Sequence, residues 1–354
     1  MGGFLMSQNQ QSHPNNNPAA VNILQLFSQD EAQTVRLKRL KKQPWRTFYS
    51  LFIAKAKRKQ EAQYANILQK QHVAKLWNIF LDQYFAGKLA SFQLKAKKQF
   101  SDQKIIWQYW GQGLEAAQQN NTVKLCFASV DRFKGDYQVI RLDENSVREY
   151  LDLPDFVWEK KKNPQFKPAF FADLIRLALL DVYGGVWIDA TILLTAPIDP
   201  TILQQDFFMF QRMDSAQNKE FWTMFNADYF GWDNEHVVNV LNSFIVGKKD
   251  NLLMHICVEI MLNYWKTQSN IPHYFFFQIM FHQLTCKNLN ETKFLKLDDT
   301  LVHLLQISQN EEMNQEKYDE IVNKTMIHKL NYIKDIRLNS FNAYIQSQYI
   351  NKIE

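Results

Sequence analysis

One stretch, residues 168–197, constrains the fold of this chain more than any other. Apolar residues recur at spacings of three and four over 170–182, which predicts a buried helix. Gly184 and Gly185 follow, and glycine tolerates the left-handed backbone that ends a helix and allows a tight turn. Apolar and polar residues then alternate over 186–192, which predicts a strand. The stretch therefore predicts a helix, a glycine break and a strand.

The alternation places Asp189 on one face of the predicted strand with Trp187 and Thr191. Burying a carboxylate costs several kcal/mol unless a cation or hydrogen-bond donors receive it. Asp173 and Arg176 are three residues apart and share a face of the preceding helix. Such a pair alone is typical of a structural ion pair that pins a helix to a strand. The indole and the hydroxyl beside Asp189 favour a binding site instead.

Three segments resemble the bacterial capsular polysaccharide synthesis glycosyltransferases. They are Ala-Asp-Leu-Ile-Arg-Leu-Ala-Leu-Leu at 172–180, Tyr-Gly-Gly-Val-Trp-Ile-Asp-Ala-Thr at 183–191 and Ile-His-Lys-Leu at 327–330. That family is related to Golgi mannosyltransferases and to the clostridial glucosylating toxins, which are GT-A enzymes. The wider clan carries Asp-x-Asp on the strand, whereas Thr191 stands here at the second position. Two strand carboxylates therefore cannot hold a metal in this chain.

The resemblance, over about 104–330, implies an α/β fold: a GT-A-like nucleotide-binding domain with a mostly parallel central sheet. Alternating strand and helix patterns from Lys104 onward predict the same sheet. Strands are expected at 104–109, 123–130, 137–143, 206–210 and 242–249, and helices at 251–267 and 273–284. The expected organisation is a disordered tail over 1–20, a basic helical region over 21–101 and a glycosyltransferase domain over 102–354.

The resemblance also implies the roles of individual residues. Asp189 and Asp173 are the expected catalytic residues. Asp189 would orient the ribose, the sugar or a metal, while Asp173 and Arg176 would hold sugar hydroxyls. Gly185 and Thr191 complete this part of the expected donor-binding site.

Trp110 and the late His-Lys pair supply the other expected donor contacts. Trp107 is expected in the core, whereas Trp110, beside Gly111, resembles the tryptophan on which the nucleotide base stacks in the family. His328 and Lys329 would meet the diphosphate, with His328 and Asp189 as ligands of Mn²⁺ or Mg²⁺. The alternative for His328 and Lys329 is an ordinary surface pair.

Positive charge is concentrated in the N-terminal region. Residues 36–98 contain sixteen Lys and Arg against two acidic residues, whereas 99–354 contain twenty-five basic and thirty-two acidic residues. Trp45, Phe48 and Phe52 precede a lysine run at 55–59, a composition typical of a helix on an anionic membrane surface. Alternatively, the aromatic residues pack on the catalytic domain and the lysines are solvated. No nucleic-acid motif accompanies the charge, so we expect no nucleic acid partner.

The three cysteines, Cys126, Cys257 and Cys286, are far apart and lack metal-ligand spacing, which favours reduced thiols. The first ten residues lack the pattern of a signal peptide, and no apolar run approaches eighteen residues. We therefore expect a cytoplasmic protein, peripheral at the inner face of the plasma membrane.

The functional expectation is a glycosyltransferase that moves a hexose or N-acetylhexosamine from a nucleotide-diphosphate sugar, a UDP-sugar first, to a capsule or lipopolysaccharide glycan. The resemblance to retaining relatives implies an α-linkage. The alternative is a non-catalytic nucleotide-sugar-binding or scaffold component of a polysaccharide assembly complex, which the missing second carboxylate favours. The sequence does not favour a nucleotide-dependent oxidoreductase, since no Gly-x-Gly-x-x-Gly follows an expected strand.

Overall fold

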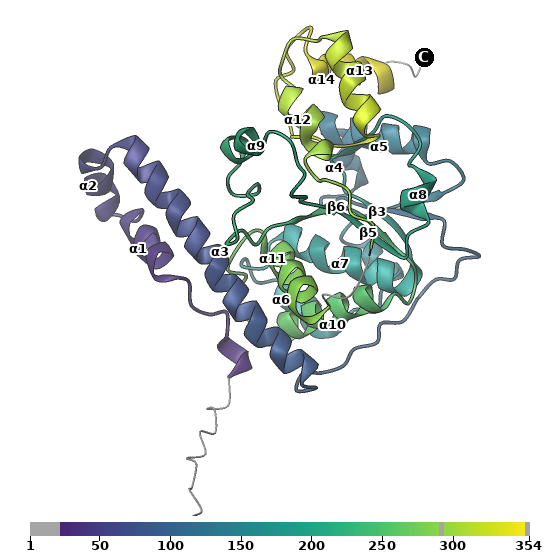
Figure 1. Cartoon of the computed structure of the whole chain (residues 1–354). Coiled ribbons are helices and arrows are strands. Elements are labelled where there is room, and N and C mark those ends of the chain that lie inside the picture. The colour runs from purple at the N-terminus through teal and green to yellow at the C-terminus, as the bar shows by residue number, and fades with distance from the viewer. Residues whose placement is uncertain (1–21, 290–293, 351–354) are drawn as a thin grey trace, which may run out of the picture.

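A computed structural model describes residues 22–289 and 294–350 (Figure 1). The disorder expected over 1–20 lies outside these residues. Five strands form the central sheet in the order β2-β1-β3-β6-β5, and β4 and β7 form a separate pair. The strands are Ile105–Tyr109 (β1), Gln138–Leu142 (β2), Gly185–Ile188 (β3), Ile192–Leu194 (β4), Phe207–Gln211 (β5), Val240–Gly247 (β6) and Ile327–Lys329 (β7).

The central sheet is mixed, so the expectation of a mostly parallel sheet is wrong. Strand β1 runs parallel to β2 and β3, whereas β6 runs antiparallel to both β3 and β5. Helices connect β1 to β2 and β2 to β3, as parallel neighbours require. Between β5 and β6 the chain returns through loops and one short helix, Lys219–Phe225 (α9), and the two strands meet antiparallel.

The strand expected at 123–130 is instead part of a helix, Asn121–Phe133 (α5). Asn120 caps this helix, since its side chain accepts hydrogen bonds from the backbone N–H groups of Thr122 and Val123. The apolar residues Val123, Phe127 and Val130 repeat at spacings of four and three and are all buried. The sequence therefore contained the spacing of a helix, although the segment is rich in residues that favour strands.

The strand expected over 186–192 is also interrupted. Strand β3 ends at Ile188, and the N–H of Ile192 donates to the carbonyl of Asp189 in a turn. Strand β4 then leaves the central sheet and pairs with β7. Asp189 therefore directly follows the buried strand rather than lying within it.

Two helix layers cover the sheet (Figure 1). Helices α7 (Pro168–Tyr183) and α10 (Leu252–Thr267) pack against each other on one side, with α6 (Asp155–Lys161) and α11 (Phe276–Gln283). Helix α5 lies on the other side with the C-terminal helices. The remaining α-helices of the domain are Leu114–Gln118 (α4), Pro200–Leu203 (α8), Leu304–Ser308 (α12), Gln315–Lys324 (α13) and Phe341–Tyr349 (α14).

The glycine pair after α7 sets the entry into β3. Gly184 ends the helix with a φ of 73°, and Gly185 begins the strand with a φ of 106°. A Cβ on Gly185 would lie 2.4 Å from the carbonyl oxygen of Ile105 on β1. Only glycine therefore allows β3 to approach β1 in this backbone conformation.

The N-terminal region contains Ala32–Leu40 (α1), Trp45–Phe52 (α2) and Lys55–Phe85 (α3). Helical structure in this region ends at Phe85, short of the end of the helical region expected over 21–101. The second half of α3 packs on the domain: the Trp77 ring lies 4.7 Å from that of Phe276 and 5.3 Å from that of Tyr264. The first half of α3 projects away from the domain with α1 and α2 (Figure 1).

All three cysteines are free thiols, as the sequence predicts. In the part of the chain that the structure describes, no helix is both long and apolar enough to span a bilayer.

Candidate functional site

A cavity of about 790 Å³ opens where β1 and β3 end and β6 begins, and is called the sheet-edge cavity below. Helix α7 brings Asp173 and Arg176 to it, Asp189 follows β3, Ser243 lies on β6 and Lys329 on β7. In open α/β sheets, ligands bind beyond the carboxyl ends of the parallel strands. The cavity occupies that position.

Asp189 is held by groups from three elements. The indole Nε1 of Trp187 donates to its Oδ1 at 2.7 Å. The guanidinium of Arg176 lies 3.5 Å from Oδ1, and Nζ of Lys329 lies 3.4 Å from Oδ2. Each cation attracts the carboxylate by roughly 5 kcal/mol at an effective dielectric constant of about 20, against several kcal/mol of desolvation. Burial raises the pKa of Asp189, but the two cations and the indole outweigh it and hold that pKa below its ordinary value.

Asp173 shares the guanidinium of Arg176 but responds in the opposite direction. Its Oδ1 lies 3.3 Å from Nη2 of Arg176 and accepts a hydrogen bond from Nδ2 of Asn242 at 2.9 Å. Burial raises the pKa of Asp173 to about 6, because the guanidinium offsets the burial only in part and the charge of Asp189 adds to it. Two neighbouring carboxyl groups with pKa values shifted apart are typical of functional sites.

Arg176 connects the two carboxylates to the backbone. Its side chain is only 6% exposed, and its Nε and Nη1 donate to the carbonyls of Ala172 and Asn242. Most of its donors are therefore occupied by the protein, so Arg176 positions Asp173 and Asp189 more than it offers free donors to a ligand.

Lys329 closes the network from β7. Its Nζ donates to Oγ1 of Thr191 at 2.6 Å and to Oγ of Ser243 at 3.1 Å. These are neutral hydroxyl acceptors, which an ammonium group can exchange for phosphate oxygens. Lys329 and Thr191 both line the cavity with Asp189, so the structure brings these three predicted residues together.

Aromatic side chains line another part of the cavity. Trp110 follows β1, and its ring centroid lies 6.0 Å from that of Tyr332. The indole Nε1 of Trp110 is buried and lacks a hydrogen-bond partner among the described residues. Trp107 is fully buried and donates to the carbonyl of Gly184, so the prediction that it belongs to the core is confirmed.

The structure does not bring His328 to the cavity. His328 and Lys329 are consecutive on β7, and consecutive strand residues face opposite ways. His328 is fully buried, its Nε2 lies 3.0 Å from Oγ1 of Thr195, and burial lowers its pKa to about 3. The expected ligand pair of Asp189 and His328 is therefore not formed, and neither is the alternative of a surface pair.

Two further observations concern the predicted donor and metal residues. Gly185 lies at the start of β3, at the opposite end of the strand from Asp189, and does not line the sheet-edge cavity. Among residues 22–289 and 294–350, no group of three or more His, Cys, Asp or Glu side chains is arranged to hold a metal ion.

The hydrogen-bonded row that two buried amide side chains form with Asp173 was not predicted from the sequence. Asn242, whose Nδ2 holds Asp173, accepts a hydrogen bond from Nε2 of Gln278 at 3.0 Å. Both residues are buried. Two patterns in the sequence could have predicted this row: a lone polar residue in the apolar run 275–281 and an Asn-Ser pair within the apolar strand β6. Buried polar groups require hydrogen-bond partners, so such residues are expected to pair with each other.

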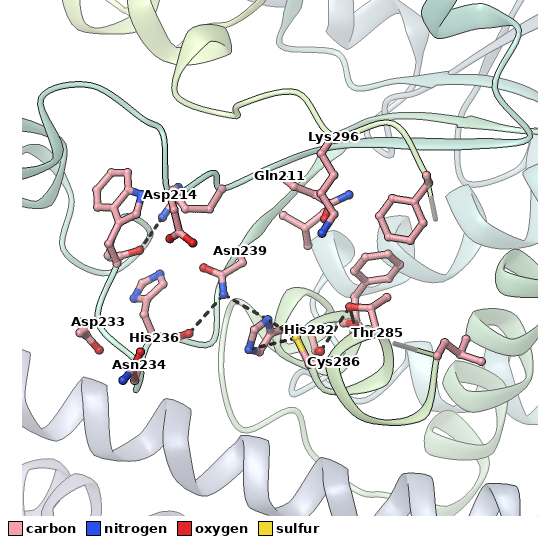
Figure 2. Close-up of a pocket in the computed structure, with 17 residues that line it drawn as sticks. Gln211, Asp214, Asp233, Asn234, His236, Asn239, His282, Thr285, Cys286 and Lys296 are labelled. Atoms are coloured by element: carbon pink, nitrogen blue, oxygen red, sulfur yellow. Dashed lines mark hydrogen bonds between the residues drawn. The ribbon is translucent and has the colours of Figure 1, made fainter. Parts of the chain in front are cut away.

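A second cavity, of about 400 Å³, lies beside β5, β6 and α11 (Figure 2). There, Nδ2 of Asn239 lies 3.1 Å from Nδ1 of His282, and burial lowers the pKa of His282. None of the site residues predicted from the sequence lines this cavity. The sheet-edge cavity, where six of them meet, is therefore the candidate site: Trp110, Asp173, Arg176, Asp189, Thr191 and Lys329.

Comparison with known proteins places these residues in a family. The family model described as capsular polysaccharide synthesis protein matches residues 55–349, from the first residue of α3 to the last of α14. A curated relative, glycosyltransferase afumC of Aspergillus fumigatus (strain CBS 144.89 / FGSC A1163 / CEA10), is 30% identical over an alignment of 125 positions that covers 32% of this chain. The aligned part spans about a third (31%) of the length of that relative. The match from 55 to 349 includes all the predicted site residues, and the chain belongs to the capsular polysaccharide synthesis protein family.

Proposed function

We propose that the chain is a glycosyltransferase that moves a hexose or N-acetylhexosamine from a UDP-sugar to a glycan acceptor in capsule or lipopolysaccharide synthesis. The observation that carries the proposal is the meeting of Asp189, Lys329 and Trp110 at one cavity beyond the strand ends. Family membership and a relative named as a glycosyltransferase support the reaction class. The GT-A assignment belongs to the same proposal.

The cavity offers a distinct contact for each part of such a donor. The base stacks on Trp110, whose ring is flanked by Tyr332. The carboxylate of Asp189 accepts hydrogen bonds from sugar or ribose hydroxyls, because the cations beside it keep it ionised. Lys329 exchanges the hydroxyls of Thr191 and Ser243 for oxygens of the diphosphate.

The reaction breaks the bond between the anomeric carbon and the oxygen of the β-phosphate, and the bonding electrons stay on that oxygen. The ammonium of Lys329 stabilises the negative charge that develops there. The acceptor hydroxyl attacks the anomeric carbon from the side of the departing phosphate. That phosphate takes the proton of the hydroxyl, and the new bond between sugar and acceptor is an α-linkage. Asp189 and Asp173, fixed by Arg176, keep the sugar oriented during transfer.

A divalent cation fits this site only in part. Asp189 lies at the cavity, whereas His328 faces away from it. Mn²⁺ or Mg²⁺ would take one carboxylate from the protein and its other ligands from the diphosphate and water. When bound, it would supply further stabilisation of the leaving diphosphate.

A binding screen followed by a turnover assay tests the proposal. UDP-, GDP- and CMP-sugars with and without Mn²⁺ are added to the protein, and the donor that raises the melting temperature is identified. Release of the free nucleotide from that donor (UDP, GDP or CMP) is then measured. We expect a UDP-sugar to stabilise the protein and to be cleaved. Stabilisation without any cleavage, with or without acceptor, would favour the non-catalytic binding component, and no stabilisation by any donor would refute nucleotide-sugar binding.

A further inference from the structure

A cleft of about 430 Å³ between α2 and the start of α3 is lined by five cationic side chains and is called the basic cleft below. They are Lys41, Arg46, Lys55, Arg58 and Lys59. Tyr49, Ser50 and Ala62 complete the lining, and no acidic residue takes part. Five like charges around one small space repel each other unless an anion enters.

The cations of the basic cleft lack partners in the described part of the chain. None of the five forms an ion pair within 4.0 Å, whereas nearby Lys38 pairs with Asp30. The Nε of Arg58 is buried without a hydrogen-bond partner. Helix α3 begins at Lys55 without a side-chain cap, so its first backbone N–H groups add positive potential at the same place. The cleft is therefore built to receive an anion.

The outer face of α2 has a different character. Trp45, Phe48, Leu51 and Phe52 recur at helical spacing, and between 47% and 77% of their surfaces are exposed. No residue of α2 is buried, so these side chains do not pack on the domain, and the packing alternative is wrong for them. Trp77, in the second half of α3, does enter the core.

We propose that α2 and the basic cleft form a docking surface for a bilayer that carries anionic phosphate headgroups. The apolar face of α2 enters the boundary between headgroups and acyl chains, and the cations beside it bind the phosphates. A soluble phosphate would account for the cleft but not for the exposed aromatic residues. An acidic protein would need a complementary apolar surface, and a bilayer supplies both kinds of contact without further specificity.

Docking at this surface would also orient the sheet-edge cavity. The second half of α3 is fixed in the core, and before it Asn66 and Lys70 bind Asp228 through its side chain and carbonyl. The neighbouring residues Asn226 and Tyr229 line the sheet-edge cavity. Helix α3 thus links the docking surface to one wall of the candidate site. If the proposed transferase function holds, an acceptor carried on a lipid reaches the cavity from the same bilayer.

Vesicle co-sedimentation tests the docking surface independently of any activity. The full chain is mixed with vesicles of phosphatidylcholine alone or with phosphatidylglycerol added, at 50 mM and 500 mM salt. We expect binding only to the anionic vesicles and its loss at high salt, because the Debye length falls below about 5 Å. Glycerol phosphate at millimolar concentration should not displace the protein, which separates a bilayer from a free phosphate.

Three variants locate the binding. Lys41, Lys55 and Lys59→Gln should weaken binding on the order of a hundredfold, at about fivefold per lysine. Phe48 and Phe52→Ser should abolish retention while leaving the charge unchanged. Lys134, Lys249 and Lys266→Gln remove the same charge from exposed positions of the domain and should bind as the wild type does. Equal melting temperatures establish that each variant is folded.

Several outcomes would overturn the proposal. The proposal is wrong if the wild-type protein does not bind anionic vesicles at low salt. It is also wrong if the control substitutions of domain lysines weaken vesicle binding as much as those in the basic cleft. Displacement by glycerol phosphate would make the cleft a site for a soluble anion. Capture of an acidic protein in preference to vesicles, lost in both the lysine and the phenylalanine variants of the docking surface, would replace the bilayer with a protein partner.

Discussion

The Nζ of Lys329 lies 3.4 Å from Oδ2 of Asp189, although the two residues are 140 positions apart in the sequence. Lys329 reaches this position because β7 pairs with β4, which directly follows the turn after Asp189. The pair thus joins the end of the central sheet to the small second sheet. The pair places an ammonium group that can bind phosphate oxygens beside an ionised carboxylate.

Lys329 should matter to the transfer step more than to folding. Lys329→Gln retains hydrogen bonding to Thr191 and Ser243 but removes the charge that faces the leaving diphosphate. We expect kcat/KM for the donor to fall on the order of a hundredfold. The control is Lys324→Gln, a lysine at the exposed end of α13. If both variants retain wild-type kinetics, Lys329 is a structural residue.

Arg176→Lys retains the charge but loses the planar fork that spans Asp173, Asp189 and the backbone of β6. We expect the free energy of unfolding to fall by about 2 kcal/mol and the donor KM to rise, because both carboxylates lose their fixed position. Chemical denaturation and donor titration measure the two effects. The exposed Arg337→Lys serves as the control. Unchanged stability and an unchanged donor KM would show that the planar guanidinium of Arg176 is not needed to position the two carboxylates.

The pH dependence of stability should reveal Asp173. Its pKa is raised from 3.8 to about 6 in the folded protein, so folding favours proton uptake at this carboxyl group. The stability that it contributes is present below about pH 4 and is lost as the pH rises through about 6. Relative to Asp173→Asn, the wild type should therefore lose roughly 2–3 kcal/mol between pH 4 and pH 7. A flat difference across this range would contradict the raised pKa.

A divalent cation should bind together with the nucleotide rather than alone, because the cavity supplies Asp189 but not His328. We expect Mn²⁺ to raise the melting temperature only when UDP is present. His328→Ala should lower the melting temperature without changing this joint effect, since His328 packs against Thr195. A shift by Mn²⁺ alone that disappears in His328→Ala would restore His328 as a ligand.

Local patterns predicted much of this structure. The glycine pair, the buried helix before it and the strand that leads to Asp189 follow from spacing and from the backbone freedom of glycine. The meeting of Asp173, Arg176 and Asp189 follows as well, because a tight turn folds the helix back beside the strand. These features depend on neighbours in the sequence.

Features that depend on distant pairing were not predictable in the same way. The direction of β6 is decided by the return path from β5. The burial of His328 depends on the pairing of β7 with β4, which fixes which of two consecutive residues faces the cavity. The Ile-His-Lys-Leu motif identifies both residues but not the register in which β7 pairs with β4.

The most direct test of the central claim is the rate of sugar transfer by Asp189→Asn. The substitution is nearly isosteric and removes the charge that Arg176 and Lys329 hold in place. With the donor identified by the binding screen, we expect transfer to fall at least on the order of a hundredfold while the melting temperature changes by a few degrees at most. Asp152→Asn, at an exposed position of the same domain, should transfer at the wild-type rate. Wild-type transfer by Asp189→Asn would contradict the assignment of the sheet-edge cavity as the active site.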